Sequence, residues 1–166
     1  MASVPNPTVT YRIDEAGLAH DERLLGLFRL WQSKRRERPM PARADFGHEE
    51  LQPWFGNLIL LDVIDGGADY RYRLFGLVLA TEAGFDMTGK LLSEYPLKDR
   101  LPHFREVFAQ VLRDPVPALS EHDPGVSNVR RRRRLILPLA KDGRAVDMLM
   151  TANYAVDIVR KPDPYL

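Results

Sequence analysis

Cysteine and long apolar runs are both missing from this chain of 166 residues. Without cysteine, the chain can hold no disulfide, Cys-ligated zinc, iron–sulfur cluster or thiol nucleophile. The longest stretches free of polar residues, such as 58–61 and 135–140, fall far short of the roughly 20 residues of a transmembrane helix. The N-terminal segment has no basic start, no apolar centre and two prolines, unlike a secretory signal. We therefore expect a soluble, cytoplasmic protein with no membrane partner.

An excess of charge of one sign is missing as well. The chain has 24 Lys and Arg against 23 Asp and Glu, which gives a formal net charge of +1. Such a balance provides no overall field to hold a nucleic acid backbone or an anionic membrane. With 45% apolar residues at this length, the composition predicts one globular domain that buries a core without disulfides or a structural metal.

The pattern along the chain divides it into three parts. Residues 1–18 are predicted to be a polar, poorly ordered lead that contains proline. A flanking helix is predicted over 19–38, because apolar side chains recur at helical spacing between an acidic first turn and a basic last turn. Pro39 and Pro41 end that helix, and residues 39–160 form the main domain.

Two hairpins are predicted in the main domain. The first joins strands 57–64 and 69–75 through a glycine turn, and the second joins strands 129–139 and 145–154. Between the hairpins, short helical pieces precede a longer amphipathic helix over 101–112. Strands paired as hairpins on either side of a helical middle predict an α+β fold with an antiparallel sheet and helices on one face.

Six segments in this order resemble the PAS domain superfamily, and in particular a family of small stand-alone bacterial PAS-like proteins of unknown cellular role. They lie between residues 20 and 155 and comprise 30–46, 58–63, 70–76, 88–90, 134–139 and 146–150. The resemblance implies a five-stranded antiparallel sheet with helices on one face and an N-terminal flanking helix. The run Arg130 to Arg134 departs from it, because one or two arginines are expected at that place.

The resemblance also implies a functional class without a reaction: sensing or binding a small ligand between the sheet and the helices. Large apolar side chains are the candidates for lining such a cavity, and equally for filling a core: Trp54, Phe55, Tyr72, Leu74, Phe85, Leu101, Phe104 and Phe108. We expect most of them to be core, with room for a small pocket.

We predict no cofactor, no metal site and no catalytic residue. By the resemblance, His103 lies where haem-binding PAS proteins carry their axial histidine, but we expect a surface or cap histidine. The four histidines share no metal-ligand spacing. The glycine and lysine spacing over 84–90 matches a phosphate-binding loop, but Leu91 stands where a Ser or Thr should be. Residues 120–123 contain the residue types of a catalytic triad and are predicted to form a polar loop.

The arginine run is predicted to be a strand with side chains on both faces, so no single surface holds all five. Acids such as Glu121 and Asp123 are expected to pair with some of them. We therefore expect solvated or salt-bridged arginines and do not expect a nucleic acid partner.

The flanking helix is predicted to be a homodimer interface. Its apolar stripe, formed by Leu24, Leu27, Phe28 and Trp31, is backed by Leu25 and Leu30, which is more apolar surface than docking on the chain's own sheet requires. The alternative is that the helix caps its own sheet and buries both sets.

The sequence thus predicts a non-catalytic PAS-like sensory module that binds a small molecule, a separate signalling protein, or both. One alternative is a homodimerisation or scaffold module with a filled core and no ligand. Another is a small α+β enzyme that uses an acid such as Asp62 or Glu82.

Overall fold

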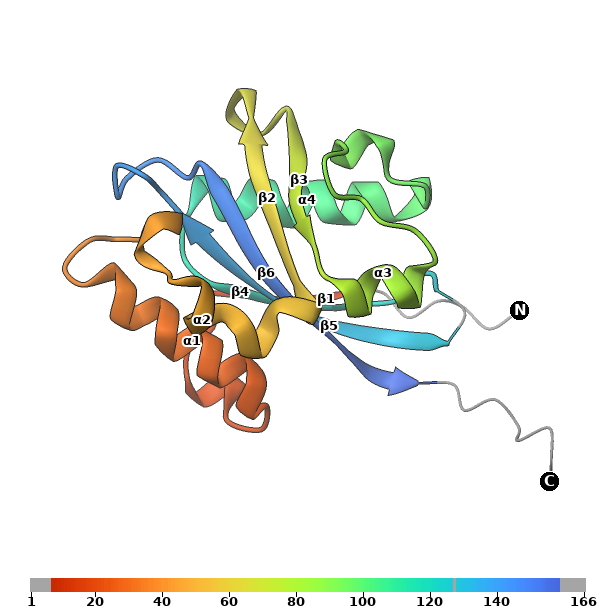
Figure 1. The fold of residues 1–166 in the computed structure, drawn as a ribbon, viewed down its shortest axis with the longest axis horizontal. Helices are drawn as coiled ribbons and strands as arrows, with labels where there is room; N and C mark the ends of the chain where they lie inside the picture. Colours follow the sequence, from red (N-terminus) through yellow and green to blue (C-terminus); the bar gives the residue numbers. More distant parts are fainter. Residues whose placement is uncertain (1–6, 127, 159–166) are drawn as a thin grey trace.

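In a computed structural model, which describes residues 7–126 and 128–158, the chain is built on a six-stranded antiparallel sheet (Figure 1). The strand order is β1-β4-β5-β6-β2-β3. The strands are β1 (Thr8–Tyr11), β2 (Leu58–Ile64), β3 (Asp69–Phe75), β4 (Ala118–His122), β5 (Val129–Leu139) and β6 (Met148–Ile158). The helices are α1 (Glu22–Arg35), α2 (His48–Leu51), α3 (Leu77–Ala83) and α4 (Leu101–Arg113), joined in places by short 3₁₀ turns.

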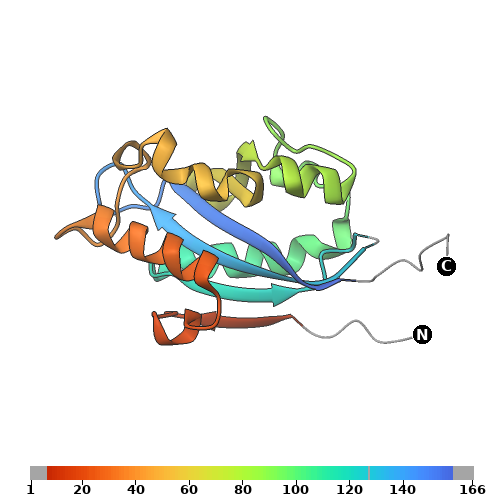
Figure 2. The same ribbon diagram turned by 60° about the horizontal axis from the view of Figure 1, so that its bottom comes forward.

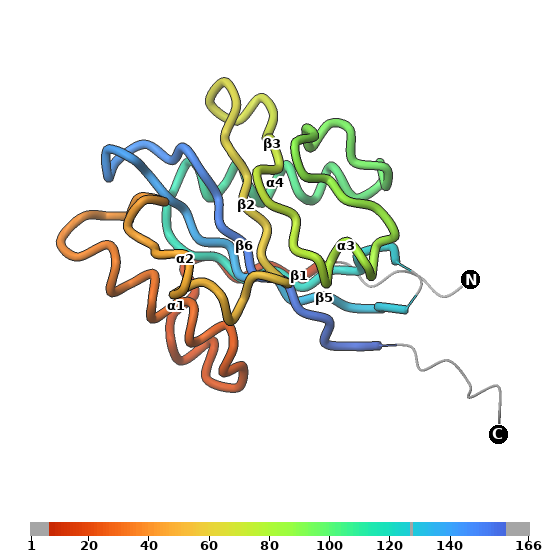
Figure 3. The backbone as a smooth tube through the Cα atoms, viewed as in Figure 1, coloured from red at the N-terminus to blue at the C-terminus, as the bar shows by residue number. Residues whose placement is uncertain are grey.

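Both predicted hairpins are confirmed. β2 pairs with β3 antiparallel, and β5 pairs with β6 over most of their length, from Val129–Ile158 to Leu139–Met148. β5 and β6 run side by side through the middle of the sheet (Figure 3). The α+β class is confirmed with them, and the predicted helix over 101–112 is α4.

The sheet has six strands, not the five that the resemblance implies, and two of them, β1 and β4, are absent from the four strands predicted from the sequence pattern. β1 lies inside the segment expected to be a poorly ordered lead and pairs with β4 at the edge of the sheet. It is short and largely exposed, so it carries no clear apolar alternation. β4 does alternate, with Ala118, Ser120 and His122 buried, but two of these buried residues are polar. Polar residues on the buried side made β4 look like a loop.

Helices cover both faces of the sheet, not one. The apolar residues of α1 form a core cluster with Leu135 and Leu137 of β5. Those of α4 cluster instead with Ile136, which lies between these two leucines in β5, and with Leu149 of β6. Successive residues of a strand point to opposite faces. In Figure 2, α1 passes in front of the strands and α4 lies behind them. We call these two sides the α1 face and the α4 face.

The four stripe residues of α1 lie in the core of this chain. Leu24, Leu27, Phe28 and Trp31 are at most 3% exposed, and the Trp31 indole Nε1 donates a hydrogen bond to the Pro138 carbonyl at 2.9 Å. The Asp21 side chain caps the helix by accepting from the Leu24 N–H at 3.2 Å. The helix therefore caps its own sheet, and the expected role of these residues as a dimer interface is wrong, because they present no surface to a second chain.

Candidate functional site

The eight side chains predicted to line a cavity do not face one space. Trp54, Phe55 and Leu74 pack against the core of the α1 face. The other five belong to the α4 face, where three are buried and two partly buried: Tyr72, Phe104, Phe108, Phe85 and Leu101. Tyr72 and Leu74 separate because the pairing of β2 with β3 shifts register between Leu60 and Leu61. Only the five on the α4 face remain candidates for one cavity.

Buried polar side chains gather on the α4 face, where the sequence pattern suggested only apolar core. β5 contributes Arg132 and Arg134, and β4 contributes Ser120 and His122, which pair with them across the strands. His103 comes from α4, and its ring centroid lies 5.6 Å from that of His122. We call these five residues the arginine–histidine cluster.

Arg131 and Arg133 point to the other face, as the predicted alternation requires. Arg131 and Arg133 both donate to the carboxylate of Glu121, at 2.5 and 2.8 Å. Arg133 also reaches Asp21 at 3.1 Å. The expected pairing with Glu121 is therefore confirmed, whereas Asp123 interacts with Arg100 instead.

Arg134 is the most unusual member of the cluster, because it is 6% exposed and has no carboxylate within 4.0 Å among the described residues. Its Nε donates to Asn153 Oδ1 at 2.9 Å, and its Nη2 lies 3.5 Å from His122 Nε2. Its guanidinium carbon stacks over the Phe104 ring, 4.3 Å from the centroid. Burial lowers the Arg134 pKa to about 10, so the side chain still carries its charge at neutral pH.

Several polar atoms of the cluster are buried without a hydrogen-bond partner in the described part of the chain. They are Arg132 Nε, His122 Nδ1, His103 Nε2 and Ser120 Oγ. Arg132 uses its Nη2 to bind Glu82 of α3. Because an arginine can only donate, His122 Nε2 accepts from Arg134, and the orphaned Nδ1 of the neutral ring carries the proton. Leaving such groups unpaired costs about 1–3 kcal/mol each, so these atoms call for an explanation.

The triad residue types at 120–123 are not arranged for catalysis. Ser120 and His122 share one face of β4, and Glu121 points to the other, where it binds arginines. No hydrogen bond joins Ser120 to His122 among the described residues. The two acids considered for an enzyme are also engaged with arginines, Asp62 with Arg73 at 2.9 Å and Glu82 with Arg132.

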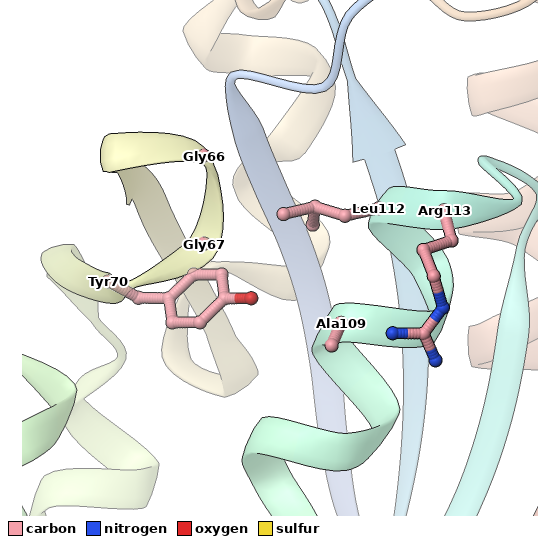
Figure 4. A pocket seen from close by; sticks show the side chains of 6 residues that line it. All are labelled: Gly66, Gly67, Tyr70, Ala109, Leu112 and Arg113. Carbon is pink, nitrogen blue, oxygen red and sulfur yellow. The ribbon is translucent and has the colours of Figure 1, made fainter.

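A pocket of about 260 Å³ lies between the β2–β3 turn and the end of α4, away from the arginine–histidine cluster (Figure 4). Figure 4 shows the Tyr70 hydroxyl directed from β3 toward α4, and this hydroxyl is buried without a partner in the described chain. Arg113, at the rim, is exposed and donates to Gln110. With a neutral hydroxyl and one solvated cation, this pocket offers less to a ligand than the arginine–histidine cluster.

Acid should destabilise the fold through His122. Burial and the charge of Arg134 hold its pKa well below the ordinary value, and Arg132, Arg100 and His103 face it as well. Near pH 6.5 and below, this histidine binds a proton in the unfolded chain but not in the folded chain. The free energy of unfolding is therefore highest above that pH and falls below it, by up to about 1.4 kcal/mol per pH unit. Urea unfolding between pH 7 and 5 measures this slope.

His122→Gln should reduce that slope to the part that His103 contributes, because the pKa of His103 is also lowered by burial. His20→Gln, at an exposed position, should leave the slope unchanged. Carboxylates with lowered pKa values, such as Asp45 and Glu121, act in a separate window at lower pH. An equal slope in His122→Gln and the unaltered chain would contradict the assignment.

Among the comparisons with known proteins, the match to a family model identifies one family. A family model described as the PAS domain matches residues 20–152. A solved structure of an RNA-binding light-oxygen-voltage receptor is similar at 10% sequence identity with a TM-score of 0.46, over 70% of this chain. This chain corresponds to 36% of the length of that structure. No curated protein matches.

In the part of the chain that the structure describes, no helix has the length and apolar character to cross a membrane, and no group of three or more His, Asp or Glu could hold a metal.

Proposed function

The chain belongs to the PAS domain family, and from this premise we propose that it is a non-catalytic sensory module that binds a small molecule at the arginine–histidine cluster. The observation that carries the proposal is the set of buried, unpartnered polar atoms on the α4 face. A bound molecule with matching polar atoms would satisfy them, whereas a filled apolar core would leave their desolvation cost uncompensated.

We also propose that the module signals by contact with a separate protein, through α3. The inner side of this helix carries Glu82, which holds Arg132 of the cluster. At the start of α3, Leu77 is 77% exposed, and Val78 is exposed as well. A ligand that changes the Arg132–Glu82 contact would shift a helix that presents apolar side chains outward, which suits a partner surface.

The scaffold module with a filled core is supported by a different observation. Phe104 packs against Phe108, Tyr95 and His122 with ring centroids 5.4–6.4 Å apart, as in an ordinary aromatic core. A homodimer is compatible with either function, but it has to use a surface other than the α1 stripe. The cytoplasmic location stays a prediction from the sequence.

Native mass spectrometry of protein purified without denaturant tests the proposal. We expect a noncovalent small-molecule adduct on the unaltered chain, and its loss in His122→Phe, which removes both ring nitrogens from the cluster. Tyr70→Phe is the matched control, because it removes an orphaned hydroxyl from the pocket between the β2–β3 turn and α4 and should keep the adduct.

The same spectra report the mass of the assembly. A chain without adduct, whose thermal midpoint does not respond to any member of a small-molecule library, would favour the filled core. An adduct that persists in His122→Phe but is lost in Tyr70→Phe would place the site in the pocket beside Tyr70.

A further inference from the structure

We infer that the ligand of the arginine–histidine cluster is a small organic monoanion whose carboxylate lies against Arg134; this rests on the proposed function and names the ligand class. The first step is the balance of charge on the α4 face. Arg132 and Arg134 are both buried, and Glu82 binds Arg132 alone. Neither histidine is charged at neutral pH, because burial lowers the pKa of both. One positive charge therefore remains without a counter-charge in the described chain.

The neutral contacts of Arg134 compensate only part of this charge. The amide oxygen of Asn153 and the face of Phe104 supply partial negative charge, at 2.9 and 4.3 Å. A fully buried cation loses its hydration, and an amide dipole with a ring face is a weaker substitute than a carboxylate. Asn153 is itself tied to Thr151 at 2.9 Å, which fixes its oxygen toward the arginine. This arrangement holds the guanidinium in place without neutralising its positive charge, which a ligand of negative charge would compensate.

The unpartnered polar atoms of the cluster favour a ligand that accepts hydrogen bonds. His122 Nδ1 and Arg132 Nε are both N–H donors without a partner among the described residues. Together with the guanidinium of Arg134, they present donors from adjacent strands. An ionised carboxylate is acceptor-only and forms its strongest hydrogen bonds with cationic donors. A cationic ligand would meet like charge and no free carboxylate.

The surroundings of the cluster favour an organic carboxylate over inorganic phosphate. One uncompensated positive charge matches a monoanion, whereas inorganic phosphate carries on average more than one negative charge at neutral pH. Phe104 and Tyr95 form a T-shaped aromatic pair near Arg134, and aromatic side chains beside a buried cation favour a ligand with an apolar body. The ligand class is therefore a carboxylate on a small apolar frame.

Binding of charge-matched probes to the full chain tests the inference. Acetate and benzoate are compared with their neutral amides, acetamide and benzamide, and with inorganic phosphate, by calorimetry and thermal shift. We expect the carboxylates to bind and raise the midpoint, and the amides not to bind. Arg134→Met should weaken benzoate binding by at least about 30-fold, as expected when one member of a buried charge pair is removed.

Two further variants keep the test decisive. Arg134→Lys retains the charge and should retain part of the affinity if Arg134→Met folds poorly. Arg73→Met removes an exposed arginine outside the cluster and should leave binding unchanged. The inference of an anionic ligand is overturned if benzamide binds as tightly as benzoate, or if neither carboxylate binds. If phosphate binds and both carboxylates do not, the ligand is an anion but not a carboxylate.

Failure of the anion is distinguishable from failure of the proposed function. A native adduct that is lost in His122→Phe and proves to be a neutral molecule would refute the anion and leave the ligand-binding function standing. Absence of both an adduct and any probe binding would refute both.

Discussion

A chain that begins at residue 39 is expected not to fold. Deleting residues 1–38 removes the four buried stripe residues of α1, each at most 3% exposed, together with the edge strand β1. Burying one such side chain contributes about 1.5–3 kcal/mol, so the stripe supplies roughly 6–12 kcal/mol. The whole stability of a domain is about 5–15 kcal/mol. The helix first expected to flank the domain is therefore part of its core.

Circular dichroism with urea unfolding checks this result, and point variants extend it. Leu27→Ala, at a site with 0% exposure, should lower the free energy of unfolding by about 2–5 kcal/mol. Leu77→Ala is the same substitution on a helix at 77% exposure and should cost within about 0.5 kcal/mol. A cooperatively unfolding chain 39–166, or equal effects of the two leucine variants, would contradict the placement of α1.

The elements with strong periodicity could be predicted because their patterns report burial directly. α4 has one apolar stripe, with Phe104, Val107, Phe108 and Val111 buried, and it ends shortly before Pro115. The hairpin of β2 and β3 carries a glycine turn in which Gly66 and Gly67 have positive φ, a conformation natural to glycine. In these segments local preference and tertiary packing agree.

The candidate site could not be predicted in the same way, because its buried residues are polar. Arg132 and Arg134 stand in a run of five arginines, which looks like a solvated strand. Their burial follows from register: they share a face with Ile136, a core residue of the α4 face. Thr151 and Asn153 of β6 were missed for the same reason, since they alternate with apolar neighbours on a buried strand. Polar residues at alternate positions of an otherwise apolar strand are the signal that would have found them.

Phe104→Ala is expected to lower the free energy of unfolding by about 3–5 kcal/mol, as large-to-small substitutions in a core do. Phe104 is buried, with its ring centroid 5.6 Å from that of Tyr95 and 5.4 Å from that of His122. Truncation also strips the aromatic face from Arg134, which lies over it at 4.3 Å. Phe104→Leu separates the two effects, because it retains most of the apolar contact and loses only the ring. Chemical denaturation with equal midpoints for Phe104→Ala and the unaltered chain would show that this side chain neither fills the core nor screens the buried arginine.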